Sequence, residues 1–245
     1  GTGFVGSYII DELISSGFNV KMINREKYSL STNCSQVTIN LSSSMLYKEM
    51  EGCDCVIYNI GIIREFPNQG ISFKSLHQDL AIHAINMAEK ANVRKFILMT
   101  ANGVDRCTTN YQRTKFNAER YLINSKLSWT IFRPSLIFGD PRGRMEFCSQ
   151  IKKDMLDIPI PAPLFFKGFN ILDAGAFKMS PIHVKNIAQF FVKSINKEDS
   201  NSQIYEIGGS RYFSWKEIIK IISVASNKKK YFFPIPVILI RFLSF

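Results

Sequence analysis

The first six residues have the composition and spacing of a turn that holds a phosphate group. They read Gly-Thr-Gly-Phe-Val-Gly, and glycines at these points let a backbone approach a pyrophosphate closely. The helical pattern that follows would offer unpaired N–H groups and the positive end of its dipole to the same anion. The spacing also fits a longer glycine pattern that begins before residue 1. We therefore expect the pyrophosphate of a dinucleotide to be held by Gly1, Thr2, Gly3, Phe4, Val5 and Gly6.

The end of the next expected strand concerns the ribose of such a dinucleotide. This strand ends near Asn24, about 20 residues after the glycine turn, where an Asp or Glu usually binds the ribose of NAD. The chain has Asn24-Arg25 there instead, and a guanidinium favours a 2′-phosphate. The pattern predicts NADP(H) over NAD(H). Glu26 keeps NAD(H) open, and the alternative interpretation of Arg25 is an ordinary exposed loop residue.

Tyr111 and Lys115 have the spacing of an acid–base pair. At positions i and i+4 of a helix the two side chains share a face. A neighbouring ammonium lowers the pKa of a tyrosine from about 10, so that the phenol can exchange protons with a carbonyl or hydroxyl group. The spacing recurs at Tyr212 and Lys216. We interpret that second copy as a coincidence at the start of a helix.

The elements that must position these residues alternate between strand and helix. Apolar runs predict strands at 18–23, 36–39, 54–60, 95–100 and 129–133, and helical spacing predicts helices that end near residue 15 and span 73–91 and 111–124. This order predicts an α/β fold, a Rossmann-type doubly wound parallel sheet. The strand that would precede Gly1 is expected to be missing from the sequence.

A looser pattern follows the sheet. Prolines at 159, 161 and 163 mark an irregular segment, after which we expect a strand at 177–182, a helix at 184–195, a strand at 204–207 and a helix at 214–225. We expect these to form a smaller α/β lobe, so that residues 1–139 bind the dinucleotide and residues 140–245 form a substrate or partner lobe over the carboxyl edge of the sheet.

Composition excludes several classes of protein. The chain has 245 residues, 46% of them hydrophobic, and its mean hydropathy is −0.01, which suits a globular core. No apolar run is long enough to span a bilayer. The five cysteines form no C-x-x-C pair, which argues against a disulfide scaffold or zinc ribbon. His77 and His83 are six residues apart on the expected helix, too far round it for a shared metal site.

The net charge of +11 is concentrated in the second half of the chain. Residues 1–122 hold 13 basic and 11 acidic side chains, whereas residues 123–245 hold 18 and 9. No nucleic-acid module is present, so we expect no nucleic-acid partner. The alternatives are a solvated face or a docking surface for an acidic protein or anionic lipid. The Lys228–Lys230 triplet precedes an apolar end, residues 231–245, that allows at most peripheral membrane contact.

The order of motifs resembles that of the extended and atypical short-chain dehydrogenase/reductases. The motifs are the glycine turn, Asn59-Ile60-Gly61, Thr100-Ala101, Tyr111 with Lys115, residues 133–139 (RPSLIFG), residues 179–184 (MSPIHV) and residues 205–209 (YEIGG). Within that superfamily, residues 58–65 and 95–105 are similar to the group of the NADH:ubiquinone oxidoreductase alpha-subcomplex subunit nine, an accessory subunit of respiratory complex I.

The resemblance implies roles for further residues. Asn40 and Leu41 would lie beside the adenine, and Pro134 and Ile137 would form a wall at the nicotinamide. The nicotinamide ribose would be lined by Asn59, Ile60 and Gly61 and gripped by Tyr111 and Lys115.

Catalysis in this superfamily also needs a Ser or Thr hydroxyl near the tyrosine. Here the strand ends in Thr100-Ala101-Asn102, so Thr100 is the candidate third catalytic group beside Tyr111 and Lys115, although it stands early in the motif. An ordinary ribose-gripping role for Tyr111 is the alternative.

Two functions are therefore expected. The first is a complex I accessory or assembly-like subunit that binds NADPH structurally and docks on a respiratory-complex or other acidic protein surface. The second is an active NADP-dependent reductase, or an epimerase or dehydratase, for a small or nucleotide-linked substrate. A redox-sensing regulator is a third class. The expected location is the cytoplasm or the mitochondrial matrix side, peripheral to the inner membrane.

Overall fold

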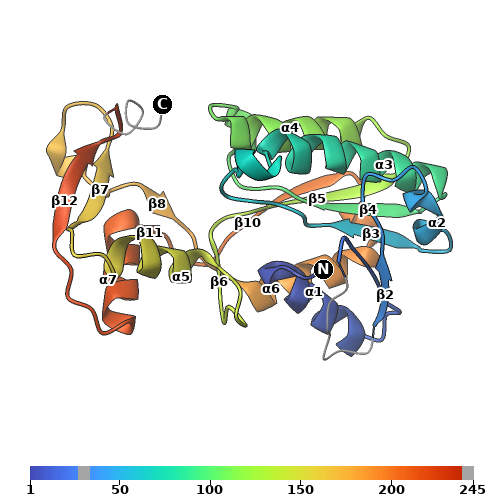
Figure 1. The fold of residues 1–245 in the computed structure, drawn as a ribbon, viewed down its shortest axis with the longest axis horizontal. Coiled ribbons are helices and arrows are strands. Elements are labelled where there is room, and N and C mark those ends of the chain that lie inside the picture. The colour runs from blue at the N-terminus through green and yellow to red at the C-terminus, as the bar shows by residue number, and fades with distance from the viewer. Residues whose placement is uncertain (27–33, 239–245) are drawn as a thin grey trace. The chain divides into compact units, whose positions relative to one another are not determined.

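A computed structural model describes residues 1–26 and 34–238 of the chain (Figure 1). The chain divides into two compact units. The first comprises Gly1–Pro134 and Val184–Ile207, and the second comprises Ser135–His183 and the residues from Gly208 onward. The division differs from the single boundary expected at residue 139, because the chain leaves the first unit after Pro134 and returns to it at Val184.

The first unit is built on parallel strands. Four of them are hydrogen-bonded in the order β10-β5-β4-β3, and β1 pairs separately with β2. The strands are β1 (Lys21–Asn24), β2 (Ser35–Thr38), β3 (Cys55–Tyr58), β4 (Lys95–Met99), β5 (Ser128–Pro134) and β10 (Gln203–Ile207). Because every pair is parallel and helices connect the strands, the predicted doubly wound α/β class is confirmed.

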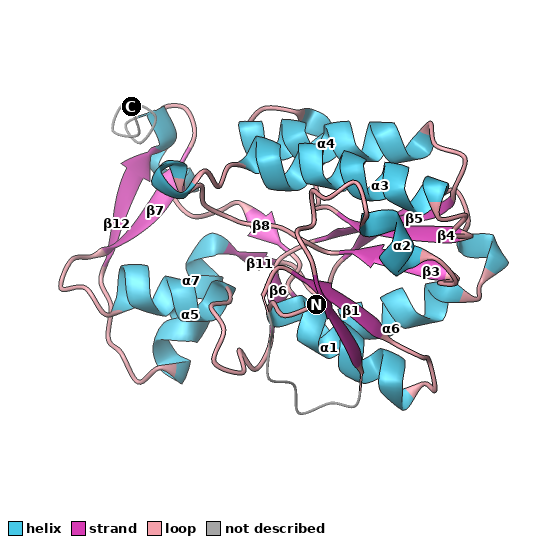
Figure 2. Ribbon diagram, turned by 45° about the vertical axis from the view of Figure 1, so that its right-hand side comes forward, coloured by secondary structure: helices cyan, strands magenta, loops and turns pink. Residues whose placement is uncertain are grey.

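Helices cover both faces of this sheet. In Figures 1 and 2, α3 and α4 lie on one face, and α1 and α6 lie on the other. The helices are α1 (Phe4–Ser15), α2 (Leu46–Met50), α3 (Leu80–Lys90), α4 (Asn110–Ile123) and α6 (Val184–Ile195), with short 3₁₀ turns at Pro67–Gln69, Val104–Arg106 and Glu198–Ser200. The helix expected at 73–91 is divided, because Lys74–Asp79 is a π-helix that runs into α3.

The segment 184–207 was expected in the smaller lobe, and this expectation is wrong. β10 pairs with β5 as the edge strand of the main sheet, and α6 packs on α1. Phe191 of α6 is fully buried, with its ring centroid 4.7 Å from that of Phe132 in β5. The physical reason is that Phe132 and its neighbours in β5 are buried on both faces, so the strand needs a helix on each.

A cavity of about 650 Å³ separates β1 from β3 within the first unit. No hydrogen bond joins the β1-β2 pair to the four-stranded sheet among the described residues. The cavity is lined largely by core side chains such as Ile10, Leu46 and Leu80, which belong to helices on both faces. It is therefore a gap in the plane of the sheet, and its lining also includes Gly1, Gly6 and Asn59 of the predicted cofactor site.

The second unit is a small α/β layer around one aromatic anchor. Trp215 is buried, its ring lies 5.6–6.3 Å from the rings of Phe147, Phe165 and Phe177, and its Nε1 donates to the carbonyl of Pro163 at 3.0 Å. The elements are β6 (Ile137–Phe138), α5 (Phe147–Ile151), a π-helix (Lys152–Leu156), β7 (Ala162–Phe166), a 3₁₀ turn (Ile171–Asp173), β8 (Lys178–Met179), β9 (Ile182–His183), β11 (Phe213–Ser214), α7 (Trp215–Ala225) and β12 (Phe232–Pro236).

Short strand pairs organise this unit. β7 pairs with β12 in parallel, β8 pairs with β11, and β6 pairs with β9. The single strand expected at 177–182 is thus two short strands with different partners, because Pro181 interrupts the ladder between them. Part of the apolar end, Phe232–Pro236, is the strand β12, and residues 239–245 lie outside the described residues. Among the helices that the structure describes, none has the length and apolarity to cross a membrane.

Candidate functional site

The glycine turn is packed where its geometry requires glycine and open where a ligand would approach. A Cβ atom at Gly6 would lie 2.7 Å from the carbonyl oxygen of Gly1, and one at Gly1 would lie 2.7 Å from the sulfur of Met22. A Cβ atom at Gly3 would meet nothing within 4 Å. Gly3 is also the N-cap of α1, which has no side-chain cap bond and no acidic residue in its first turn. The turn therefore suits a phosphate anion at the helix N-terminus.

The end of β3 links this turn to the tyrosine and lysine. A Cβ atom at Gly6 would lie 3.0 Å from the side-chain nitrogen, Nδ2, of Asn59. A Cβ atom at Gly61 would lie 3.3 Å from Nζ of Lys115. The structure therefore brings the glycine turn, Asn59–Gly61 and Lys115 together along the carboxyl edge of the sheet, as the order of motifs predicts.

Tyr111 and Lys115 form a contact pair in a buried environment. Nζ of Lys115 lies 5.5 Å from the centroid of the Tyr111 ring, and the Lys115 side chain is buried. Within the described part of the chain, neither the Tyr111 hydroxyl nor Nζ of Lys115 has a hydrogen-bond partner. Both are donors whose partner a ligand could supply.

The direction of the pKa shift at Tyr111 differs from the sequence expectation. Burial raises the pKa of Tyr111 to about 12. Burial also lowers the pKa of Lys115 to about 8, against an opposing effect of the Glu119 carboxylate. Removal from water disfavours both the phenolate and the ammonium, and it outweighs the pairing on which the sequence argument rested.

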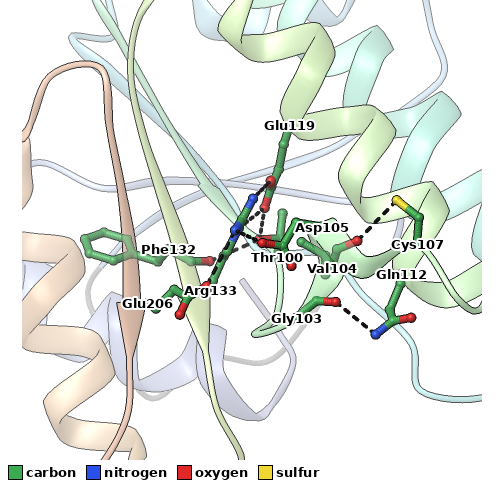
Figure 3. A network of polar contacts seen from close by, with 10 residues as sticks. All are labelled: Thr100, Gly103, Val104, Asp105, Cys107, Gln112, Glu119, Phe132, Arg133 and Glu206. Carbon is green, nitrogen blue, oxygen red and sulfur yellow. Dashed lines mark hydrogen bonds and ion pairs between the residues drawn. The ribbon is translucent and has the colours of Figure 1, made fainter.

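Thr100 does not present its hydroxyl for catalysis. Its Oγ1 donates to Oε1 of Glu119 at 2.5 Å and approaches the carbonyl of Phe132 at 3.4 Å, and the residue is 3% exposed (Figure 3). The structure therefore gives no support to Thr100 as the third catalytic group, because its one O–H is committed to a buried carboxylate.

Glu119 and Arg133 form the centre of this buried network, which the sequence analysis missed. Nε and Nη2 of Arg133 donate to the two carboxylate oxygens of Glu119 at 3.0 and 2.6 Å (Figure 3). Nη1 also lies 3.2 Å from Asp105 and 3.6 Å from Glu206, and the hydrogen bond to Glu119 is the main reason that the pKa of Arg133 is raised. The sequence signal that could have drawn attention to Glu119 is its i, i+4 spacing from Lys115 on α4. The network ties α4 to the ends of β4, β5 and β10.

Comparison with known proteins identifies the family. Residues 1–158 match the model of a family described as NAD(P)H-binding. The chain belongs to this NAD(P)H-binding family. Dinucleotide binding by the Rossmann-type unit is thereby established as a property of its family, as the glycine turn predicts.

Among the curated relatives of this NAD(P)H-binding chain are two subunits of the respiratory NADH dehydrogenase. The mitochondrial NADH-ubiquinone oxidoreductase 40 kDa subunit of Neurospora crassa is 22% identical, over 94% of this chain and 59% of its own length. The mitochondrial NADH dehydrogenase (ubiquinone) 1 alpha subcomplex subunit 9 of Dictyostelium discoideum is 21% identical, over 90% of this chain and 61% of its own length. The chain thus spans about three fifths of these two subunits. The decarboxylating sterol-4-alpha-carboxylate 3-dehydrogenase of Dictyostelium discoideum is 22% identical, over 98% of this chain and 80% of its own length.

Solved structures share the fold. MoeE5 in complex with UDP-glucuronic acid and NAD has a TM-score of 0.76 and 18% identity, over 96% of this chain and 83% of that one. UDP-glucuronic acid 4-epimerase from Bacillus cereus in complex with NAD also has a TM-score of 0.76 and 18% identity, over 96% of this chain and 83% of that one. The resemblance to short-chain dehydrogenase/reductases and complex I subunits that the motifs predicted is confirmed.

The other predicted cofactor residues of the NAD(P)H-binding chain occupy varied positions. Asn24 is buried at the end of β1, and Arg25 follows it exposed to solvent. Asn40 is exposed and accepts a hydrogen bond from the Ser42 amide at 3.0 Å, while Leu41 packs against the core. Thr2, Phe4 and Val5 lie partly buried at the start of α1, and Ile60 packs against the core.

The two residues expected beside the nicotinamide belong to different units. Pro134 is the buried last residue of β5. Ile137 lies in β6 of the second unit, where it pairs with Ile182. The second Tyr-x₃-Lys copy is the start of α7, as predicted: Tyr212 is 73% exposed, and Ser214 caps the helix with a capping box.

Proposed function

We propose that this chain binds NADP(H) as a structural element and serves as an accessory subunit of a larger respiratory assembly. The observation that carries the proposal is the hydrogen bond from Thr100 to Glu119. It withdraws the hydroxyl that would orient a substrate oxygen. A Tyr111 pKa of about 12 also leaves the phenol protonated at neutral pH. A tyrosine in this state suits hydrogen bonding to a ribose better than proton transfer.

The residues present fit a dinucleotide. The open face at Gly3 and the uncapped start of α1 suit the pyrophosphate. The unpartnered hydroxyl of Tyr111 and ammonium of Lys115 suit two hydroxyl groups of a ribose. A bound nicotinamide would supply hydride chemistry, which the accessory role does not use.

The preference for NADP(H) over NAD(H) rests on Arg25. Its exposed guanidinium follows the end of β1, where a ribose 2′-phosphate would give it a charge-assisted partner. The neighbouring carboxylate of Glu26 works against an added phosphate charge, and the guanidinium of Arg25 offsets it.

The proposed docking surface is the basic second unit, and the partner that it fits presents acidic side chains. Residues 135–183 and 208–245 together hold 13 basic and 6 acidic side chains. Part of the lysine triplet is engaged within the unit, because Nζ of Lys228 lies 3.3 Å from Asp157 and Nζ of Lys230 donates to the carbonyl of Ile158. Lys229 is exposed and is the member of the triplet that suits a partner. The proposed location is the matrix side of the mitochondrial inner membrane.

A second candidate function is an active NADP-dependent reductase or epimerase. One observation favours it: Tyr111 and Lys115 are adjacent and their polar atoms are unengaged, as they would be in a site awaiting substrate. Enzymes are also present among the relatives and the structural neighbours.

The experiment that separates these functions measures binding and turnover on the same samples. Thermal unfolding is followed with NADPH, with NADH and with neither, since a ligand at 100 times its Kd stabilises the native state by about 2.7 kcal/mol. Arg25→Gln should remove the advantage of NADPH over NADH, while Arg120→Gln, an exposed arginine on α4, should leave it intact. No stabilisation by either nucleotide would refute the proposal.

Turnover and assembly complete the test. Oxidation of bound NADPH by carbonyl substrates, or reduction of bound NADP+ by UDP-sugars, abolished in Tyr111→Phe, would establish the enzyme instead. Copurification of the tagged chain with a respiratory complex, weakened by Lys229→Glu, is the result expected of an accessory subunit.

A further inference from the structure

His77 lies at the junction of three elements that carry the candidate site. It belongs to the π-helix Lys74–Asp79, a rare geometry that is frequent at functional sites. The side chain is 2% exposed. Its ring stacks on Phe73 with a centroid distance of 5.3 Å and meets the Tyr111 ring edge-on at 5.2 Å. The imidazole is therefore fixed by packing on both sides.

The hydrogen bond of His77 defines its protonation state. The backbone N–H of Ile62 donates to Nε2 at 3.0 Å, so Nε2 is an acceptor and the proton of the neutral ring is on Nδ1. Burial, assisted by the charge of Lys115, lowers the pKa of His77 to about 3. The ring is thus neutral throughout the physiological range, and proton exchange is not its task.

The Ile62 amide belongs to the turn that follows Gly61. Residues 61–64 have no helical or strand structure, and within the described residues the bond to His77 is the hydrogen bond that fastens them to another element. A Cβ atom at Gly61 would lie 3.6 Å from Nε2 of His77 and 3.3 Å from Nζ of Lys115. The position of the turn relative to Lys115 therefore depends on His77.

We propose that His77 is a positioning residue: by accepting the Ile62 amide it holds the Gly61–Ile62 turn against Lys115 and Tyr111, and so shapes the part of the site that receives the nicotinamide half of the cofactor. This inference rests on the proposed nucleotide binding. A dinucleotide whose pyrophosphate lies at α1 spreads its two halves along the carboxyl edge of the sheet. The β1 side carries Arg25, and the side of β3 and α4 carries His77. His77 should consequently affect one half of the cofactor and not the other.

Three substitutions divide the roles of the imidazole. His77→Gln retains an acceptor near the position of Nε2, His77→Asn retains only a polar group near Nδ1, and His77→Leu retains neither. His83 lies further along the same helix and has its Nε2 3.0 Å from the carbonyl of Ser43, so His83→Leu is the matched control. The ligands are NADPH and adenosine 2′,5′-bisphosphate, which contains only the adenosine half.

His77→Leu should weaken NADPH binding by about tenfold or more, because the partly buried Ile62 amide loses its acceptor and the turn loses its anchor. His77→Gln should stay within about threefold of wild type. The affinity for adenosine 2′,5′-bisphosphate should not change in any variant. Equal loss of both ligands in His77→Leu would indicate general damage and overturn the inference. Rescue by His77→Asn but not by His77→Gln would overturn it as well, because the essential atom would then be Nδ1.

Amide hydrogen exchange tests the same point without a ligand. The Ile62 amide should be protected in wild type and in His77→Gln, and should lose at least about tenfold of its protection in His77→Leu. An unprotected Ile62 amide in the wild type would refute the positioning role. Absence of any nucleotide binding by the wild type would refute the proposed function, while the exchange result would still decide whether His77 holds the turn.

Discussion

Both carboxylate oxygens of Glu119 are engaged by the guanidinium of Arg133, at 3.0 and 2.6 Å, and Glu119 is fully buried. The pair explains why Lys115, one helical turn before Glu119, has no ion-pair partner among the residues that the structure describes. It also explains why the hydroxyl of Thr100 faces a carboxylate. The carboxylate of this buried ion pair thus removes the Thr100 hydroxyl from the catalytic arrangement that the motifs suggest, and it leaves Lys115 beside Tyr111.

The first prediction concerns the stability of this pair. Glu119→Gln should lower the free energy of unfolding by about 3 kcal/mol, because it removes the buried countercharge of Arg133 and leaves only the partly exposed Asp105 and Glu206 as charged partners. Denaturant unfolding measures the change. The control is Lys74→Gln, which breaks the exposed Lys74–Asp79 pair and should cost less than about 1 kcal/mol. Similar losses in the two variants would contradict the importance of the buried pair.

The second prediction concerns the pH dependence that Lys115 imparts. Its pKa is about 8 in the native state against 10.5 in the unfolded chain, so between these values the unfolded state binds more protons. Stability should therefore rise with pH by up to about 1.4 kcal/mol per unit in this window. The measurement is the difference in unfolding free energy between wild type and Lys115→Met from pH 7 to 10. A difference that stays flat would show that Lys115 titrates normally.

The third prediction separates packing from ligand approach in the glycine turn. Gly6→Ala should destabilise the chain by about 1–3 kcal/mol, because its Cβ would press on the Gly1 carbonyl. Gly3→Ala should change stability by less than about 0.5 kcal/mol, since its Cβ meets open space and its backbone is extended, but it should reduce the thermal shift caused by NADPH. A Gly3→Ala variant with an unchanged shift would place the phosphate elsewhere.

The fourth prediction concerns Gly209 in the second unit. A Cβ atom there would lie 2.1 Å from the carbonyl oxygen of Pro181, whose neighbour Ser180 accepts the Gly209 amide at 3.0 Å. Gly209→Ala should therefore destabilise by at least about 1–3 kcal/mol. The adjacent exposed Ser210 gives the control Ser210→Ala, which should be neutral. Calorimetry of the two variants measures the change, and a Gly209→Ala variant as stable as Ser210→Ala would contradict this steric role of Gly209.

The sequence by itself determined the parts of the protein that depend on local pattern. The alternation of apolar runs with helical segments predicted the parallel sheet, and the spacing of glycines in residues 1–6 predicted a turn that suits a phosphate. Several elements follow the pattern closely, such as α6 at Val184–Ile195, because an amphipathic period is a property of consecutive residues. The i, i+4 spacing likewise placed Tyr111 and Lys115 on one face of α4.

Only the tertiary structure decided what depends on partners distant in the chain. The burial that reverses the expected pKa shift of Tyr111 comes from residues such as Phe73 and His77. Thr100 is committed by Glu119, 19 residues later, and β10 joins β5 by pairing Gln203 with Thr130, 73 residues earlier. The sequence pattern predicts His77 as one residue of a long helix, whereas the structure places it in a π-helix, where it accepts the Ile62 amide. Desolvation and hydrogen bonding act between residues that the fold brings together, so the spacing of residues along the chain does not contain them.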